Sequence, residues 1–129
     1  MQGWLTSVVA LSLLLFGGAT AVANEPEVTR GANLFTQLGC AACHTVHGKG
    51  GNPGVKAPEM GGLFGSVIEL EDGQHIQVTE EYVLESIIDP DAKVHKGYTA
   101  GIMPKAFAYL EPADLEALIA FLKSLSGPR

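Results

Sequence analysis

Residues 40–44 read Cys40-Ala41-Ala42-Cys43-His44, and the interpretation of the whole chain starts from this motif. Two cysteines three positions apart, with a histidine directly after them, form the attachment pattern of c-type haem. Each thiol can form a thioether to one vinyl group of the porphyrin, and the histidine then supplies an axial nitrogen to the iron. The sequence therefore predicts one covalently bound haem c on Cys40 and Cys43, with His44 as an iron ligand.

Three other uses of the two cysteines explain less of the chain. A thioredoxin-type redox pair follows a strand inside a βαβ unit, and the sequence shows no such alternation. A zinc site needs two further ligands at metal spacing, but only the scattered His47, His75 and His95 remain. A structural disulfide in an oxidising compartment would leave His44 without a role.

The first 23 residues differ from the rest of the chain because they carry no charged side chain. Ala21-Val22-Ala23 resembles the small-residue site at which signal peptides are cleaved. We therefore expect residues 1–23 to be a signal peptide, followed by one monohaem domain over residues 24–129. An uncharged run of this length can also span a bilayer as an uncleaved anchor. Either alternative places the domain outside the cytoplasm, and the periplasm is the expected compartment.

The chain is acidic, with a formal net charge of −6, which excludes a generally basic nucleic-acid binder. Several lysines nevertheless fall in loops expected near the haem edge: Lys49, Lys56, Lys93, Lys96 and Lys105. One hypothesis is a local basic rim that steers the protein to acidic partner surfaces. The alternative is that these lysines belong to an ordinary solvated surface.

Apolar periodicity and capping residues predict three helices, over Thr29–Leu38, Glu80–Ile88 and Pro112–Leu125. Asp72-Gly73 between two apolar arms predicts a small hairpin over residues 67–78. The glycine-rich residues 45–56 and the stretch 91–108 are expected to be irregular. Gly31 lies inside the first helix, where glycine costs about 1 kcal/mol relative to alanine, so it favours a close helix crossing.

Over nearly all of residues 28–125 the chain resembles the class I cytochrome c family. The residues that carry the resemblance are Gly31, Phe35, the Cys40–His44 motif, residues 57–65, Gly101-Ile102-Met103-Pro104 and the helix over 115–125. The last two segments look especially like the cytochrome c domain fused to subunit II of some bacterial haem-copper oxidases. The resemblance implies an all-α fold, with about four short helices around one haem and a minor hairpin near 67–78.

The resemblance also implies roles for individual residues. Gly31 and Phe35 would cross Leu118 and Phe121 on the last helix, and the carbonyl of Pro58 would accept a hydrogen bond from the His44 ring. Met103 matches the family's sixth ligand. A soft thioether binds ferrous iron well, which gives an independent reason for Met103. The alternatives are that Met103 is core filler, or that His75 or His95 is the ligand.

A six-coordinate iron has no open position for substrate, so the resemblance implies an electron carrier and no enzyme. The expected protein is a monomer that exchanges electrons with redox partner proteins in a respiratory chain. Alternatives are a membrane-tethered subunit of such a complex, and a haem gas sensor or enzyme with a labile Met103. After residue 24 there is no tryptophan to bond a haem propionate, and the candidates to replace it are Tyr82, Tyr98, Tyr109, Gln74 and His75.

Overall fold

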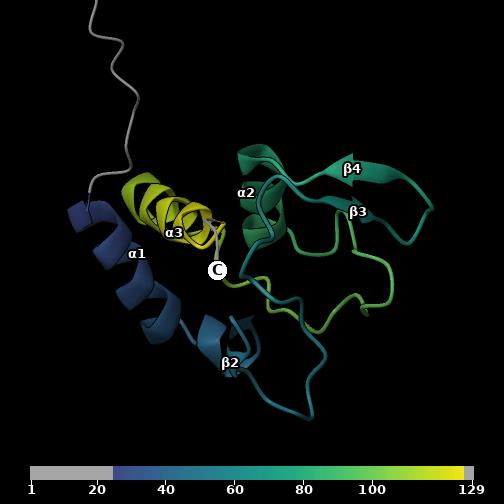
Figure 1. The fold of residues 1–129 in the computed structure, drawn as a ribbon, viewed down its shortest axis with the longest axis horizontal. Coiled ribbons are helices and arrows are strands. Elements are labelled where there is room, and N and C mark those ends of the chain that lie inside the picture. Colours follow the sequence, from purple (N-terminus) through teal and green to yellow (C-terminus); the bar gives the residue numbers. More distant parts are fainter. Residues whose placement is uncertain (1–24, 127–129) are drawn as a thin grey trace, which may run out of the picture.

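Residues 25–126, the part of the chain that the computed structural model describes, contain three α-helices, one 3-10 turn and two short antiparallel strand pairs, joined by irregular segments (Figure 1). Their bounds are α1 (Glu25–Gln37), η1 (Cys40–Ala42), β1 (Thr45–Val46), β2 (Lys49–Gly50), β3 (Val67–Glu69), β4 (His75–Gln77), α2 (Glu80–Ile88) and α3 (Pro112–Ser124). The mostly helical fold class predicted from the sequence is confirmed. The predicted signal peptide and its possible role as an anchor lie outside the described residues. Between residues 25 and 126, no helix is long and apolar enough to cross a membrane.

The first and last helices lie side by side, although they come from opposite ends of the domain (Figure 1). A Cβ atom added to Gly31 would lie 1.9 Å from the carbonyl oxygen of Ala117 and 2.7 Å from the Cβ of Phe121. One turn further along α1, the rings of Phe35 and Phe121 lie 5.5 Å apart between centroids. The close crossing predicted for Gly31 is therefore confirmed, because only a residue without a side chain fits there.

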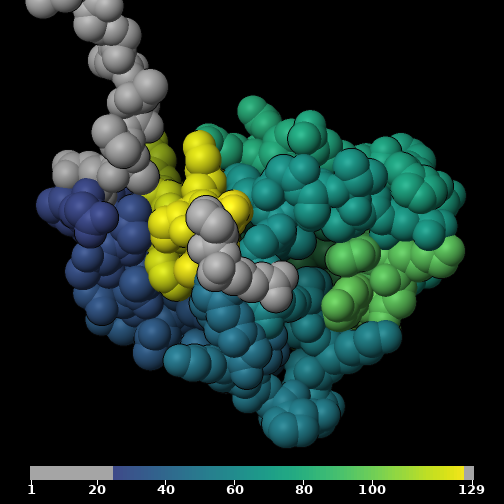
Figure 2. All heavy atoms as spheres, viewed as in Figure 1, coloured from purple at the N-terminus to yellow at the C-terminus, as the bar shows by residue number. Residues whose placement is uncertain are grey.

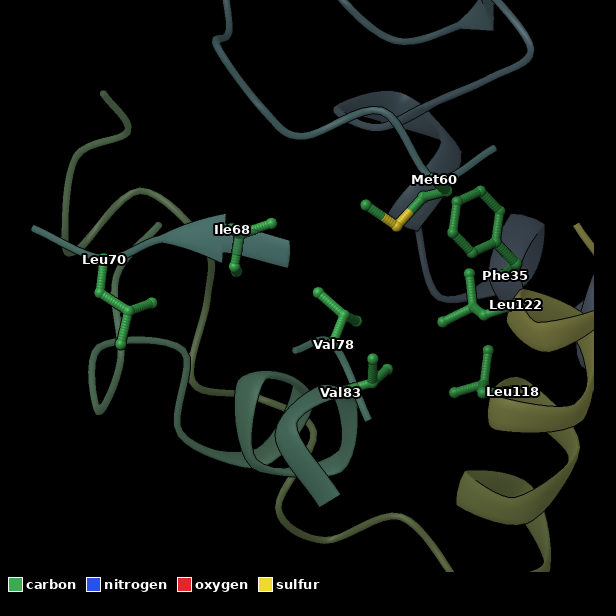
Figure 3. Close-up of a cluster of buried hydrophobic side chains, with 8 residues drawn as sticks. All are labelled: Phe35, Met60, Ile68, Leu70, Val78, Val83, Leu118 and Leu122. Carbon is green, nitrogen blue, oxygen red and sulfur yellow. The ribbon is translucent and has the colours of Figure 1, made fainter. Parts of the chain in front are cut away.

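A cluster of buried apolar side chains joins this helix pair to the rest of the domain (Figure 3). Its members are Phe35, Met60, Ile68, Leu70, Val78, Val83, Leu118 and Leu122. They come from α1, the segment before β3, the hairpin, α2 and α3. Burial of these side chains is the main source of stability that the polypeptide itself supplies.

The hairpin and the second helix have the predicted positions. β3 and β4 pair in the register Val67↔Gln77, Ile68↔Ile76 and Glu69↔His75, which leaves Asp72-Gly73 in the connecting turn. Helix α2 spans the predicted range, and the hydroxyl of Thr79 caps it by accepting the N–H of Tyr82 at 3.3 Å. Helix α3 begins at Pro112, as predicted, and Leu125 is its C-terminal cap.

Two stretches differ from the prediction. Helix α1 begins at Glu25 and not at Thr29, because Glu25 and Glu27 stabilise its N-terminal turn without contributing to the apolar stripe. The glycine-rich loop contains the short pair β1–β2. His47 and Gly48 connect its strands with positive φ angles of 50° and 73°, the geometry of the tight turns that join hairpin strands.

Candidate functional site

The five predicted site residues line a single cleft: Cys40, Cys43, His44, Pro58 and Met103. The motif lies on one side of the cleft, and the irregular stretch between α2 and α3 forms the other. In Figure 2 the light-green part of that stretch is separated from the blue-teal residues by a recess. Apolar side chains form much of the remaining lining, among them Leu38, Leu63, Val83, Ile87 and Leu122. An apolar cleft with two thiols and an imidazole on one side fits a covalently held porphyrin.

The local backbone explains why both cysteines and His44 reach the same cleft. Gly39 ends α1 with a φ of 82°, a left-handed conformation that favours glycine. The chain then turns tightly, and the N–H groups of Cys43 and His44 both donate to the carbonyl of Cys40, at 3.1 and 2.9 Å. The two thiols are free and partly buried, not joined as a disulfide. Burial raises the pKa of the Cys40 thiol.

The His44 ring is oriented by a hydrogen bond to the backbone. Its Nδ1 lies 2.8 Å from the carbonyl oxygen of Pro58. A carbonyl oxygen can only accept, so Nδ1 carries the proton and Nε2 keeps its lone pair for a metal. This contact has the geometry that the family resemblance implies for Pro58.

Glu59, which sequence reasoning did not single out, follows Pro58 directly and accepts four hydrogen bonds. The donors are the Thr45 hydroxyl (2.5 Å) and the backbone N–H groups of His47 (2.7 Å), Gly48 (3.1 Å) and Gly61 (2.8 Å). Desolvation raises the pKa of this carboxyl, but the four hydrogen bonds outweigh it and hold the pKa at about 2. Glu59 is therefore ionised at neutral pH. No spacing or periodicity in the sequence indicates that this carboxylate folds back onto the glycine-rich turn.

The opposite side of the cleft is held by backbone–carboxylate contacts. Met103 is partly buried in the lining, while its neighbour Ile102 is 57% exposed. Gly101 has a φ of 78°, and its N–H donates to Asp91 at 2.7 Å. The hydrogen bond from Gly101 is the main cause of the lowered pKa of Asp91, and the hydrogen bond from Lys105 is the second cause. These contacts fix the turn that precedes Met103.

The remaining histidines occupy different environments. His75 is exposed on β4 and is not among the residues that line the cleft, whereas His95 lines it. The His95 ring lies 5.0 Å from that of Tyr98, between centroids, and desolvation lowers the pKa of His95. His95 therefore remains the histidine alternative to Met103. His47 is exposed, and its ring packs close to Gly61.

The side chains considered for the propionates also separate into two groups. Tyr82 and Tyr98 line the cleft, whereas Gln74 and His75 do not. Tyr109 is 91% exposed and also lies outside the lining. The Nζ of Lys56 lies 5.4 Å from the centroid of the Tyr98 ring, within the range of a cation–π contact.

Three lysines of the hypothetical basic rim form ion pairs with carboxylates. Lys93 pairs with Glu85 at 2.5 Å and Lys96 with Glu69 at 2.7 Å. Lys105 lies 2.9 Å from Asp89 and 3.2 Å from Asp91. Exposed pairs of this kind contribute little to stability, because solvent screens them, but each carboxylate offsets the positive charge of its lysine. The local field around the cleft is therefore weaker than the lysines alone suggest.

The structure gives no ligand set for the zinc alternative, because no group of three His, Cys, Asp or Glu side chains within residues 25–126 could hold a metal ion.

A search of curated proteins found no match to the chain. A protein-family model described as cytochrome c matches residues 28–126. This match covers the motif, the whole cleft, helices α2 and α3, and all of α1 except its first three residues.

Proposed function

This chain belongs to the cytochrome c family, and from that premise we propose that it carries single electrons in a respiratory chain, between a quinol-oxidising complex and a terminal oxidase or reductase. The family binds haem c covalently, and Cys40 and Cys43 fit the two attachment positions. Redox partner proteins follow from this class of protein in general. The specific pathway is inferred from the likeness of residues 101–104 and 115–125 to the domain fused to oxidase subunit II.

We propose His44 and Met103 as the two axial ligands of the iron. The observation that carries this proposal is that both residues line the same apolar cleft, with the His44 ring already held by Pro58 at 2.8 Å. The hydrogen bond from Nδ1 leaves Nε2 as the only ring nitrogen with a free lone pair. Met103 supplies a soft sulfur donor, which favours the ferrous state and raises the reduction potential.

When bound, the haem supplies a one-electron couple between Fe(II) and Fe(III). The residues of the chain then have three tasks. His44 and Met103 would bind the iron from the cleft walls, which would leave no open position for a substrate and would account for a carrier with no enzymatic activity. The apolar lining from α2 and α3 excludes water. The exposed Ile102, beside Met103, offers an apolar contact at the mouth of the cleft.

The ligand proposal is tested by the weak far-red absorption band that reports a methionine sulfur on ferric haem. We expect the oxidised native protein to show the band and Met103→Ala to lose it. Met60→Leu is the matched control, because Met60 is the other methionine in the described residues and is 7% exposed in the core. A Met-to-Leu exchange conserves volume and costs less than about 1.5 kcal/mol, so this variant should keep the band.

A native protein without the band would overturn the His/Met assignment and make His95 or an open position the alternative. Carbon monoxide binding to the resting reduced protein would then favour a gas sensor or a haem enzyme.

Export to the periplasm and a monomeric state are further parts of the proposal. A purified chain that begins at Asn24 in the periplasmic fraction would support a cleaved signal peptide over residues 1–23. A chain that begins at Met1 in the membrane fraction would support the tethered subunit instead.

A further inference from the structure

One carboxylate, that of Glu59, connects the segment containing Pro58 to the turn that follows the haem motif. Its Oε2 accepts from the side chain of Thr45 and the N–H of Gly48, and its Oε1 accepts from the N–H groups of His47 and Gly61. Three of these four donors lie on the stretch 45–48, immediately after His44. The fourth lies two residues beyond Glu59 itself.

The turn at His47 needs this carboxylate. His47 has a φ of 50° and Gly48 a φ of 73°, so both lie in the left-handed region. This region is uncommon for a residue with a side chain. Consecutive N–H groups in turns of this kind converge on one side and form an anion-binding concavity. Glu59 fills that concavity and thereby holds the turn in a fixed position against its own segment.

The same segment carries the acceptor of the His44 ring proton. The Pro58 carbonyl lies directly before Glu59, and the Met60 N–H directly after it donates to the Thr45 carbonyl at 2.9 Å. Displacing Glu59 from the turn should therefore shift the Pro58 carbonyl relative to the imidazole, although the Met60–Thr45 backbone hydrogen bond also joins the two segments. Within residues 25–126, Glu59 is the side chain that hydrogen-bonds to both the 45–48 turn and the 58–61 segment.

We propose that Glu59 is a positioning residue for the haem iron: it holds the Pro58 carbonyl against the Nδ1–H of His44 and so sets the basicity of the axial imidazole. A stronger hydrogen bond from Nδ1 makes the imidazole a better donor to the metal. A better donor stabilises the ferric state and lowers the reduction potential. This inference rests on the proposed ligation by His44.

Two simpler roles have to be separated from this one. Glu59 could stabilise only the loop, which would change unfolding but not the His44 proton. Its negative charge could also lower the potential through space without any effect on hydrogen-bond geometry. The carboxyl has a pKa of about 2, so it is charged at neutral pH and the second role is a real competitor.

The experiment compares three variants with attached haem: Glu59→Gln, Glu59→Asp and Asp72→Asn. Glu59→Gln removes the charge, and its amide turns one acceptor into a donor. Glu59→Asp keeps the charge but shortens the reach to the turn. Asp72→Asn is the matched control, because Asp72 also caps a turn, accepting from the N–H of Gln74 at 3.0 Å, in the hairpin away from the cleft lining. The readouts are the exchange rate of the His44 Nδ1 proton by NMR and the haem reduction potential.

We expect proton exchange at Nδ1 to accelerate about tenfold in both Glu59 variants, with a rise in potential in each and no such changes in Asp72→Asn. Unchanged exchange in both Glu59 variants would overturn the proposal. A potential that rises in Glu59→Gln but not in Glu59→Asp, with proton exchange unchanged in both, would assign the effect to charge alone and overturn it too.

A further variant covers the case in which both Glu59 variants fail to assemble with haem. Thr45→Val removes only the 2.5 Å hydroxyl bond to Glu59 and should shift exchange and potential in the same direction, by less. If neither the exchange rate nor the potential shifted, the result would contradict the proposal.

The native protein tests the underlying function separately. If His44 were not an iron ligand, its ring protons would lack paramagnetic shifts in the ferric native protein, whatever the Glu59 variants show.

Discussion

The acidity of a single carboxyl makes the stability of the domain depend on pH. The folded-state pKa of Glu59 is about 2, compared with an ordinary value of 4.5. A lowered pKa means that the folded state holds the ionised form more strongly than the unfolded chain does. The contribution of Glu59 to stability is therefore fully present above pH 4.5, and it declines as the pH falls from 4.5 towards 2.

We predict that Glu59→Gln lowers the urea unfolding midpoint at neutral pH. The difference in midpoint between the variant and the native protein should narrow as the pH falls from 4.5 towards 2. Protonated Glu59 in the native protein resembles the variant, so the two curves should converge. Parallel curves over the whole range would show that the four hydrogen bonds do not depend on ionisation. Asp72→Asn serves again as the control, because the Asp72 carboxylate accepts hydrogen bonds from Gln74 within its own exposed turn, and no convergence is expected.

Residues whose chemistry depends on spacing could be predicted from the sequence, and residues whose role depends on folded contacts could not. Cys40, Cys43 and His44 lie within five consecutive residues, so the motif alone predicts them as site residues. Met103 was predicted from its Gly-Ile-Met-Pro context and lines the cleft. Glu59 was missed because a carboxylate after a proline has no local signature. Three of its four partners come from a turn 11 to 14 residues earlier in the chain.

The crossing of α1 and α3 is the packing contact most sensitive to a single atom. In Gly31→Ala, helix propensity gains about 1 kcal/mol, but the new methyl group would meet the Ala117 carbonyl oxygen at 1.9 Å. A backbone atom cannot move out of the way as a side chain can, so the helices must separate. Overpacking of this kind costs about 1–3 kcal/mol. We expect a net loss of stability, measured as a lower urea midpoint of the haem-loaded protein.

Asn33→Ala is the control for this prediction, because Asn33 is exposed on the same helix. It gains helix propensity without any contact to α3 and should not lower the midpoint. A Gly31→Ala protein as stable as Asn33→Ala would mean that the helices cross less closely than the structure has them.

Among the elements, helix boundaries were predicted most accurately where a capping residue or a proline starts or ends the helix. Thr79 and Asp89-Pro90 bound α2, and Pro112 opens α3, so both helices begin where predicted. The first turn of α1 has acidic residues but no apolar stripe, and the prediction therefore started the helix too late. The strand pair β1–β2 was not predicted, because its glycine-rich sequence is typical of an irregular loop. It forms through the tight turn at His47-Gly48, which Glu59 holds from a distant position in the chain.

The charge of the whole molecule bears on how it meets its partners. The chain has a formal net charge of −6. Around the cleft, three lysines are paired with the carboxylates of Glu69, Glu85, Asp89 and Asp91. Because these four carboxylates outnumber the three lysines, the lysines do not reverse the field that the overall acidity creates for a distant ion. This argues against a strong basic rim, the hypothesis that the lysine positions suggested.

We predict that the rate of oxidation by ferricyanide, a trivalent anion, rises with ionic strength, because salt screens its repulsion from the acidic protein. With the cationic oxidant tris(phenanthroline)cobalt(III), the rate should fall with ionic strength. Exchanging Lys93, Lys96 and Lys105 for glutamine should lower the ferricyanide rate at low salt without reversing either slope. Stopped-flow measurements at several salt concentrations give both slopes.

A ferricyanide rate that falls with salt in the native protein would show that a basic edge dominates, and the natural partner should then present acidic residues. The predicted slopes instead favour a partner whose docking surface is basic or apolar, since such a surface would meet an acidic protein and its exposed Ile102 without repulsion.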